Sequence, residues 1–310
     1  MSRIIIGIHG LGNKPPEELL GPWWKAAIHE GLENRGRFPF LRFRMVYWAS
    51  YLHPEPFSPF IRDRRNPLFL KEPYVRGDVR PDAGRNREMA LRLRDQVNQQ
   101  LDRIFLESDG RLNFNGLTDF ILRHFIRDLD SYYREIPLRG GSEPVSELIC
   151  RRLAEMLRKH RRKKILLIAH SMGSIIAWDV LTRYVPEVKI HTLVTIGSPL
   201  GIPVVRGRML ARIPREQGAS PVLRTPENIQ AGWYNLADFK DRVAINYDLR
   251  NEFAPNNRGV LPRDLLVYNN YEYAGERNAH KSYGYLRCPE MAEILHGFLR
   301  PGKSLPSRHR

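Results

Sequence analysis

Cysteine is nearly absent from this chain of 310 residues, and the two that occur, Cys150 and Cys288, give no disulfide framework. The C-x-x-C spacing and the H-E-x-x-H motif of zinc sites are missing, so we expect no metal site. The phosphate-binding loop G-x-x-x-x-G-K-[ST] is missing too. The glycines between positions 7 and 12 lack the G-x-G-x-x-G spacing of dinucleotide-binding proteins. The sequence therefore predicts a protein that uses no cofactor.

Long apolar runs are also missing. No run approaches the roughly 18 residues that a membrane-spanning helix needs. A β-rich run begins at Arg3, which leaves no room for a signal peptide before it. Hydrophobic residues make up 42% of the chain, enough for a substantial core. We therefore expect a cytoplasmic protein with a single domain over residues 1–310.

Acidic residues are outnumbered by basic ones, 34 to 50, for a formal net charge of +16. The densest basic cluster, at 158–164, closes a predicted helix, where cations complement the helix dipole. No aromatic-rich RNA-binding signature accompanies it, so we expect no nucleic-acid partner. A basic surface also fits peripheral contact with an anionic membrane, which we keep as a secondary hypothesis. Nothing in the sequence indicates an oligomeric state.

A serine motif stands out among the features that are present. An apolar run at 165–169 leads into the sequence Ala-His-Ser-Met-Gly at 169–173, and a helix-like pattern extends from 174 to 184. This order predicts a strand, a tight turn with Ser171 at its tip, and a helix. Small residues must flank such a turn because strand and helix approach closely there, and here Ala169 stands where the usual pattern has a glycine.

The N-terminal segment supplies a second motif. Residues 3–12 read RIIIGIHGLG, in which a β-branched run typical of a buried strand ends in an H-G-x-G sequence. Glycines at such a position let the backbone bend so that an N–H group points at a developing oxyanion.

Together the two motifs resemble the α/β-hydrolase superfamily, in the A-H-S-M-G variant of bacterial lipases and esterases. The resemblance spans residues 1–50 and 142–300. It implies that Ser171 is the nucleophile and that the backbone N–H groups of Leu11 and Met172 form the oxyanion hole. Leu200 lies past a strand end and either contacts an acyl chain or belongs to a small satellite core. The residues that we predict to contact substrate are His9, Gly10, His170 and Leu200.

Chain order assigns the partners of the serine, since the superfamily runs nucleophile, acid, histidine. A strand-like segment near 232–236 is followed by two candidate acids, of which we choose Asp241, with Asp238 as its rival. Three histidines follow. His296 lies in the helical pattern of 289–299 and His309 in a polar tail, whereas His280 lies between a strand at 265–271 and that last helix. His280 is therefore the predicted base.

Strands and helices alternate along the rest of the chain. We expect strands at 3–9, 43–48 and 190–196, helices at 15–32 and 143–158, and a long loop at 197–229. Such alternation predicts an α/β fold, a mostly parallel central sheet with helices on both faces. After the second strand, residues 53–140 form a predicted helical insertion: an irregular stretch over 53–81, then helices at 85–106 and 117–136. This insertion is either a cap over the active site or a set of helices that shields one sheet edge.

The resemblance implies a serine hydrolase that cleaves small-molecule or lipid carboxylic esters through an acyl-serine intermediate. The alternative is a catalytically silent module of the same fold that binds anionic lipid surfaces or a protein partner. Fold alone does not decide between them, because many activities share this architecture.

Overall fold

A six-stranded parallel sheet forms the centre of the protein in the computed structural model, which describes residues 2–35, 38, 41–77, 129, 132–133, 143–213, 221–244 and 248–300. The strand order is β2-β1-β3-β4-β5-β6. The strands are β1 (Arg3–Ile8), β2 (Phe43–Val46), β3 (Lys164–His170), β4 (Ile190–Ile196), β5 (Ile229–Asp238) and β6 (Pro262–Val267). A separate antiparallel hairpin pairs β7 (Glu272–Tyr273) with β8 (Glu276–Arg277).

The isoleucine run of β1 explains its central place in the sheet. β1 pairs with β2 on one side and with β3 on the other, so both of its edges are hydrogen-bonded. Ile4, Ile6 and Ile8 pack on one face of the sheet and Ile5 on the other. A strand covered on both faces needs apolar side chains at successive positions, which is the pattern that the sequence shows.

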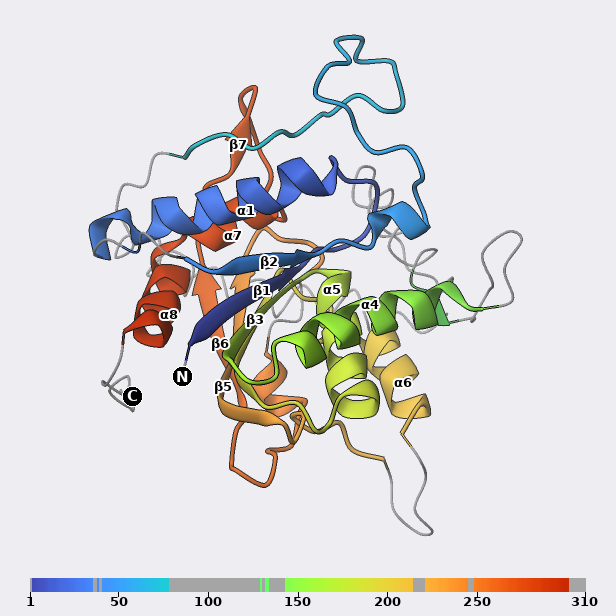
Figure 1. The fold of residues 1–310 in the computed structure, drawn as a ribbon, viewed down its shortest axis with the longest axis vertical. Coiled ribbons are helices and arrows are strands. Elements are labelled where there is room, and N and C mark those ends of the chain that lie inside the picture. The colour runs from blue at the N-terminus through green and yellow to red at the C-terminus, as the bar shows by residue number, and fades with distance from the viewer. Residues whose placement is uncertain are drawn as a thin grey trace, which may run out of the picture.

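Helices cover both faces of the sheet (Figure 1). On one face lie α1 (Glu17–Leu32), α7 (Ser282–Arg287) and α8 (Pro289–Leu299), and on the other lie α4 (Val145–Lys159), α5 (Met172–Asp179) and α6 (Pro203–Ala211). Each layer has its own buried apolar cluster, one around Ile5 and Trp24 and the other around Ile6 and Leu153. The predicted α/β fold with a parallel sheet between two helical layers is confirmed.

Three local predictions need correction. The segment 197–229, predicted as a loop, contains α6, because Pro203 opens a helical turn and Val205 and Met209, four residues apart, are both buried. The last strand ends at Val267, before the predicted Tyr271, because Asn269 forms a turn: its side-chain oxygen accepts a hydrogen bond from the N–H of Tyr271 at 3.1 Å. The helix predicted at 174–184 begins at Met172 as α5 and closes in a π-helical turn, Val180–Tyr184.

The insertion at 53–140 is described only in part. Residues 53–77 contain no α-helix or β-strand, in agreement with the irregular stretch predicted there. The helices predicted at 85–106 and 117–136 lie outside the described residues, apart from Leu129, Tyr132 and Tyr133, which are helical. Leu129 and Tyr132 are buried in the cluster that α4 and α5 form on the sheet. Whether the insertion is a cap over the active site or a shield of one sheet edge therefore stays a prediction.

Neither a membrane span nor a metal cluster is seen within the described ranges. No helix there is both long and apolar enough to cross a bilayer. No group of three or more His, Cys, Asp or Glu side chains there is arranged to hold a metal ion.

Candidate active site

Ser171 lies at the turn between β3 and α5 in a backbone conformation that few residues other than glycine adopt. Its φ is 53° and its ψ is −129°. Strain of this kind costs about 1–3 kcal/mol and persists only where the surroundings enforce it. Here the surroundings are close backbone segments: a Cβ atom on Gly10 would lie 2.6 Å from the Cβ of Ser171, and one on Gly173 would lie 2.8 Å from the carbonyl oxygen of His9. Gly10 and Gly173, one from each motif, are therefore sterically required.

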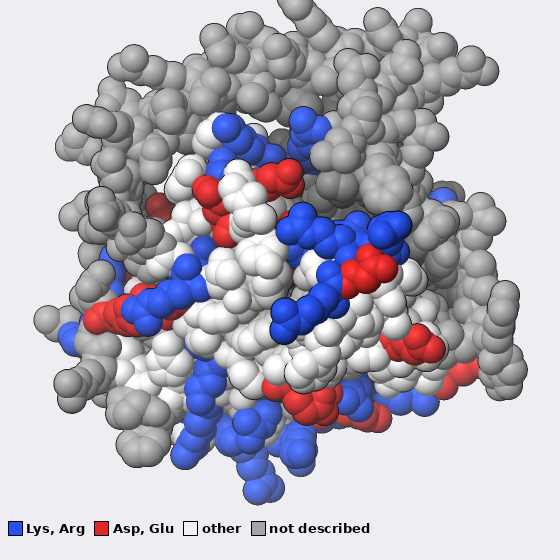
Figure 2. Space-filling view, turned by 90° about the horizontal axis from the view of Figure 1, so that it is seen from above, with Lys and Arg blue, Asp and Glu red and all other residues white. Residues whose placement is uncertain are grey.

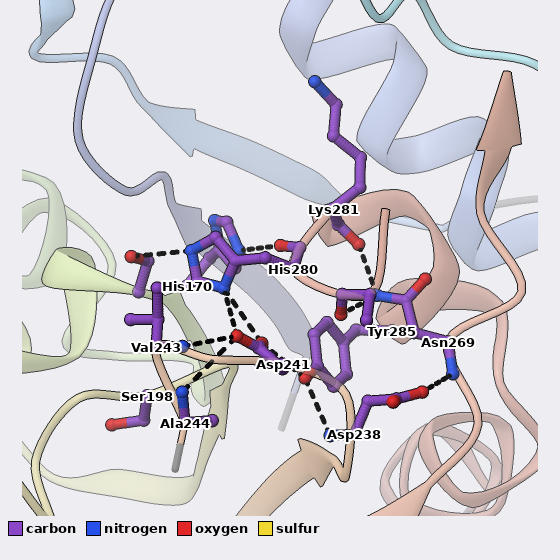
Figure 3. Close-up of polar contacts among 12 residues, drawn as sticks. His170, Ser198, Asp238, Asp241, Val243, Ala244, Asn269, His280, Lys281 and Tyr285 are labelled. Atoms are coloured by element: carbon purple, nitrogen blue, oxygen red, sulfur yellow. Dashed lines mark hydrogen bonds and ion pairs between the residues drawn. The ribbon is translucent and has the colours of Figure 1, made fainter. Parts of the chain in front are cut away.

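Ser171, His280 and Asp241 form a continuous line of hydrogen bonds. The Nε2 atom of His280 lies 3.0 Å from the Oγ of Ser171, and its Nδ1 atom lies 2.9 Å from both carboxylate oxygens of Asp241. Figure 3 shows the His280 ring joined by dashed lines to the carboxylate of Asp241. These partners fix the tautomer: Nδ1–H donates to the carboxylate, which leaves Nε2 free to accept from the serine hydroxyl.

The two candidate acids have different surroundings, although both follow β5. Asp241 is buried and accepts hydrogen bonds from the N–H of Val243 at 3.0 Å and from the hydroxyl of Tyr285 at 2.7 Å, besides the one from His280. This set of donors stabilises a carboxylate that faces the imidazole. The structure thus brings Asp241 to His280.

Asp238 holds a neighbouring loop instead. Its carboxylate pairs with Arg277 and accepts the N–H of Asn269 at 2.6 Å and the N–H of Lys240 at 2.8 Å. Burial raises the pKa of Asp238, and the Asn269 N–H and Arg277 oppose that rise. Tyr285 connects the two acids, because its hydroxyl also accepts the N–H of Asp238 at 2.8 Å.

Hydrogen bonds to backbone carbonyls hold the loop that carries His280. The side-chain amide of Asn269 donates to the carbonyls of Ala279 at 2.8 Å and Lys281 at 2.7 Å, on either side of the histidine. The side chain of His170 bonds the carbonyl of His280 itself at 2.8 Å, with its Nε2–H as donor. Three successive carbonyls are therefore held, and the imidazole is oriented before any substrate arrives.

Residues 70–77, which we call the strap, contact the same loop. Glu72 accepts the side-chain amide of Asn278 at 2.6 Å and pairs with the ammonium of Lys281 at 2.9 Å. Tyr271 and Arg287 donate to backbone carbonyls of the strap, at Pro73 and Val75. The strap is part of the insertion. These contacts therefore join the insertion to the segment that carries His280.

His9 and His170 are buried neutral histidines that support the site. Burial lowers the pKa of both rings well below the usual value; Lys14 adds to the effect at His9, and His280 adds to it at His170. His9 donates from Nδ1 to the carbonyl of Gly10 at 2.8 Å and accepts the N–H of Trp48 at Nε2, 3.0 Å away. The ring thereby fixes the bend of the H-G-x-G segment.

The residues predicted to contact substrate are buried. His9 is 1% exposed with both ring nitrogens bonded, and Leu200 is 0% exposed within the main apolar cluster on the α4–α5 face rather than in a small satellite core. His170 is buried and its Nε2 is occupied by His280. Gly10 packs directly against Ser171. These residues support the site, and their contact with a substrate remains a prediction.

The predicted oxyanion donors belong to two segments, one directly after Ser171 and the other in the bend after β1. Met172 is the first residue of α5, where helix geometry leaves the N–H without an acceptor inside the helix and adds the positive end of the helix dipole. Leu11 lies in the bend after β1. The ammonium group of Lys14 donates hydrogen bonds to two carbonyls of this bend, that of Leu11 and that of Gly12, the latter at 3.0 Å. Their role as oxyanion donors remains a prediction.

Gly197, at the end of β4, is a site residue that sequence reasoning missed. Its φ is +54°, and a Cβ atom there would lie 2.8 Å from Oδ2 of Asp241 and 3.1 Å from Nδ1 of His280. The only signal was a glycine directly after a predicted strand, which is common in any α/β protein. Tyr285 and Asn269 carried no signal at all, since their contacts form between distant segments.

One comparison with known proteins gives a match, and it covers the region around Ser171. A family model described as a PGAP1-like alpha/beta domain matches residues 122–211. The match contains α4, β3, the Ser171 turn, α5, β4 and α6. A search among curated proteins finds no match. The match and the parallel sheet support an α/β-hydrolase-type fold.

Proposed function

We propose that this protein is a serine hydrolase that cleaves carboxylic esters through an acyl-serine intermediate. The observation that carries the proposal is the hydrogen-bonded line from Ser171 Oγ through His280 to Asp241, with the serine in a strained turn. An isolated serine hydroxyl is a poor nucleophile, and an imidazole at 3.0 Å, held by a buried carboxylate, is the arrangement that activates it.

The proposed reaction follows from these positions. Ser171 Oγ attacks the ester carbonyl while its proton passes to Nε2 of His280, and the N–H groups of Leu11 and Met172 stabilise the oxyanion that forms. The imidazolium, held by Asp241, then gives the proton to the departing alkoxide, which leaves as an alcohol. A water molecule repeats the sequence on the acyl-serine, giving the free acid and restoring the serine.

Fluorophosphonate labelling combined with ester turnover tests the proposal. We expect the full chain to hydrolyse p-nitrophenyl esters, with a rate that depends on acyl length, and to be inactivated by a fluorophosphonate with one adduct on the peptide that contains Ser171. A chain that neither turns over esters nor takes up the probe would be the silent module instead, and the ester hydrolase proposal would fail.

Gly197 provides a sharper test of the site geometry. Gly197→Ala should lower ester kcat about 100-fold, because the new methyl group must displace Asp241 or His280, and misplacement of about 1 Å costs that much. Two matched glycines separate the possible causes. Gly207→Ala adds a methyl group into open space on α6, and Gly259→Ala adds one into open space at a positive φ of +71°. Both controls should keep kcat within about threefold of wild type, with the folds compared by circular dichroism. Equal losses in all three variants would contradict the steric explanation.

A further inference from the structure

A loop beside the candidate active site presents an aromatic side chain to solvent. Phe60 is 89% exposed, against 52% for Val222, the next most exposed large hydrophobic residue of the described part. The loop, residues 55–69, extends beyond the end of α1 in Figure 1. A single exposed apolar side chain is common on protein surfaces, so Phe60 indicates a partner only together with the charges around it.

Arginines surround this phenylalanine. Arg62, Arg64 and Arg65 are all exposed, and the side chain of Arg65 is 95% exposed. One acid, Asp63, lies among them, and it shapes the turn by accepting the backbone N–H of Arg65 at 2.9 Å. Figure 2 views the molecule from above, the side toward which the loop extends in Figure 1, and shows several clusters of Lys and Arg side chains over its described part. The loop therefore combines an apolar tip with excess positive charge.

The loop has a defined shape. Ser58 and Phe69 form an isolated β-bridge that joins the two sides of the loop at its base. The N–H of Ser58 donates to the carbonyl of Leu68 at 2.9 Å. Within the tip, Asn66 organises the chain by accepting the N–H of Leu68 at 2.8 Å. The tip is thus presented at a fixed place, and little ordering is needed on binding.

The root of the loop is joined to the bend that carries Leu11. The N–H of Phe57 donates to the carbonyl of Lys14 at 3.0 Å, and the side chain of Asn13 donates to the carbonyl of Glu55 at 2.8 Å. Residues 11–14 follow β1 at the carboxyl edge of the parallel sheet, where Ser171 follows β3. A flat partner on the loop would therefore lie at the edge of the sheet that holds the serine.

We propose that residues 55–69 dock the protein on anionic lipid surfaces, with Phe60 inserted among the headgroups and the arginines paired with lipid phosphates. An aromatic ring that enters the interface and guanidinium groups that pair with phosphate are the contacts that such a surface offers. The consequence for catalysis, delivery of a lipid ester to Ser171 from the bound membrane, rests on the proposed function. The docking itself does not.

Vesicle co-sedimentation tests the docking. We expect the full chain to pellet with equimolar phosphatidylcholine–phosphatidylglycerol vesicles at low salt, and to be released by high salt and by phosphatidylcholine alone. Because each arginine near such a surface contributes about fivefold to partitioning, the triple variant R62Q/R64Q/R65Q should partition at least about tenfold more weakly. Phe60→Ser should weaken binding even at low salt.

A charge-matched control removes the effect of net charge. R161Q/R162Q/K163Q deletes the same charge just before β3, at the opposite edge of the sheet, and should partition within about twofold of wild type. Absence of salt-sensitive pelleting, or equal losses in the two triple variants, would overturn the docking proposal. So would duplex DNA binding through the loop arginines without vesicle binding.

Turnover of a soluble short-chain ester keeps the two proposals separate. None of these substitutions touches the hydrogen-bonded line at Ser171, so every variant should hydrolyse the soluble ester at the wild-type rate. Failure of the wild-type chain to bind vesicles, with intact turnover of the soluble ester, contradicts only the docking proposal. Vesicle binding without any ester turnover contradicts only the proposed hydrolase.

Discussion

Ser171→Ala is expected to lower ester turnover by a factor on the order of 10³ to 10⁶ and to abolish fluorophosphonate labelling. The substitution removes the atom that bonds to Nε2 of His280, the serine Oγ at 3.0 Å. The backbone strain is unchanged, because alanine and serine both carry a Cβ atom and disfavour a φ of 53° about equally. The folded state should therefore be nearly as stable as that of wild type, and the change should appear in kcat.

Ser174→Ala is the matched control for this prediction. Ser174 is also a buried serine, one helical turn along α5, and its hydroxyl bonds the carbonyl of Ser171 at 2.6 Å and the hydroxyl of Ser198 at 2.8 Å. Its removal weakens the support of the turn but leaves the nucleophile, so kcat should stay within about tenfold of wild type. Ester turnover by the Ser171→Ala protein at the wild-type rate would refute the assignment of the nucleophile.

Local sequence patterns predicted the features that depend on local chemistry. The apolar runs at 4–8 and 165–169 need burial on both faces, and small residues around Ser171 allow strand and helix to approach closely. The helix at 15–32 was predicted from an apolar stripe, and Leu20, Trp24 and Ile28 are buried along that stripe. These features follow from the residues themselves because each is determined by its immediate neighbours in the chain.

The features that sequence could not decide depend on contacts between distant segments. Asp238 and Asp241 lie three positions apart at the end of the same strand, and their contacts with Arg277 and His280 distinguish them. Asn269 is another example, because its side chain holds two carbonyls that lie ten and twelve residues further along the chain. Leu200 was ambiguous because an apolar residue past a strand end fits a pocket or a core equally well. The helix α6 is short and contains Gly207, which weakens its pattern.

The two acids should respond to amide substitution in opposite ways. Asp241→Asn is expected to lower kcat about 10⁴-fold, because an asparagine beside His280 favours the wrong tautomer of the imidazole. Each carboxylate oxygen of Asp241 faces donors: Oδ1 accepts the N–H of Val243, and Oδ2 accepts the hydroxyl of Tyr285. Whichever way the amide turns, its NH₂ group meets another donor. The KM for a soluble ester should change little, since no substrate atom contacts this residue in the proposed reaction.

Asp238→Asn should instead lower stability and spare the chemistry. It leaves Arg277 without its charge partner and puts an amide where the N–H groups of Asn269 and Lys240 need acceptors, which should cost about 2–4 kcal/mol of unfolding free energy. The His280–Asp241 contact is untouched, so kcat per folded molecule should stay within about tenfold of wild type. Urea unfolding and active-site titration with the fluorophosphonate measure the two quantities separately. If Asp238→Asn lost 10⁴-fold in kcat while Asp241→Asn kept its rate, the acid would be Asp238, and the line of hydrogen bonds from Ser171 would not be the catalytic one.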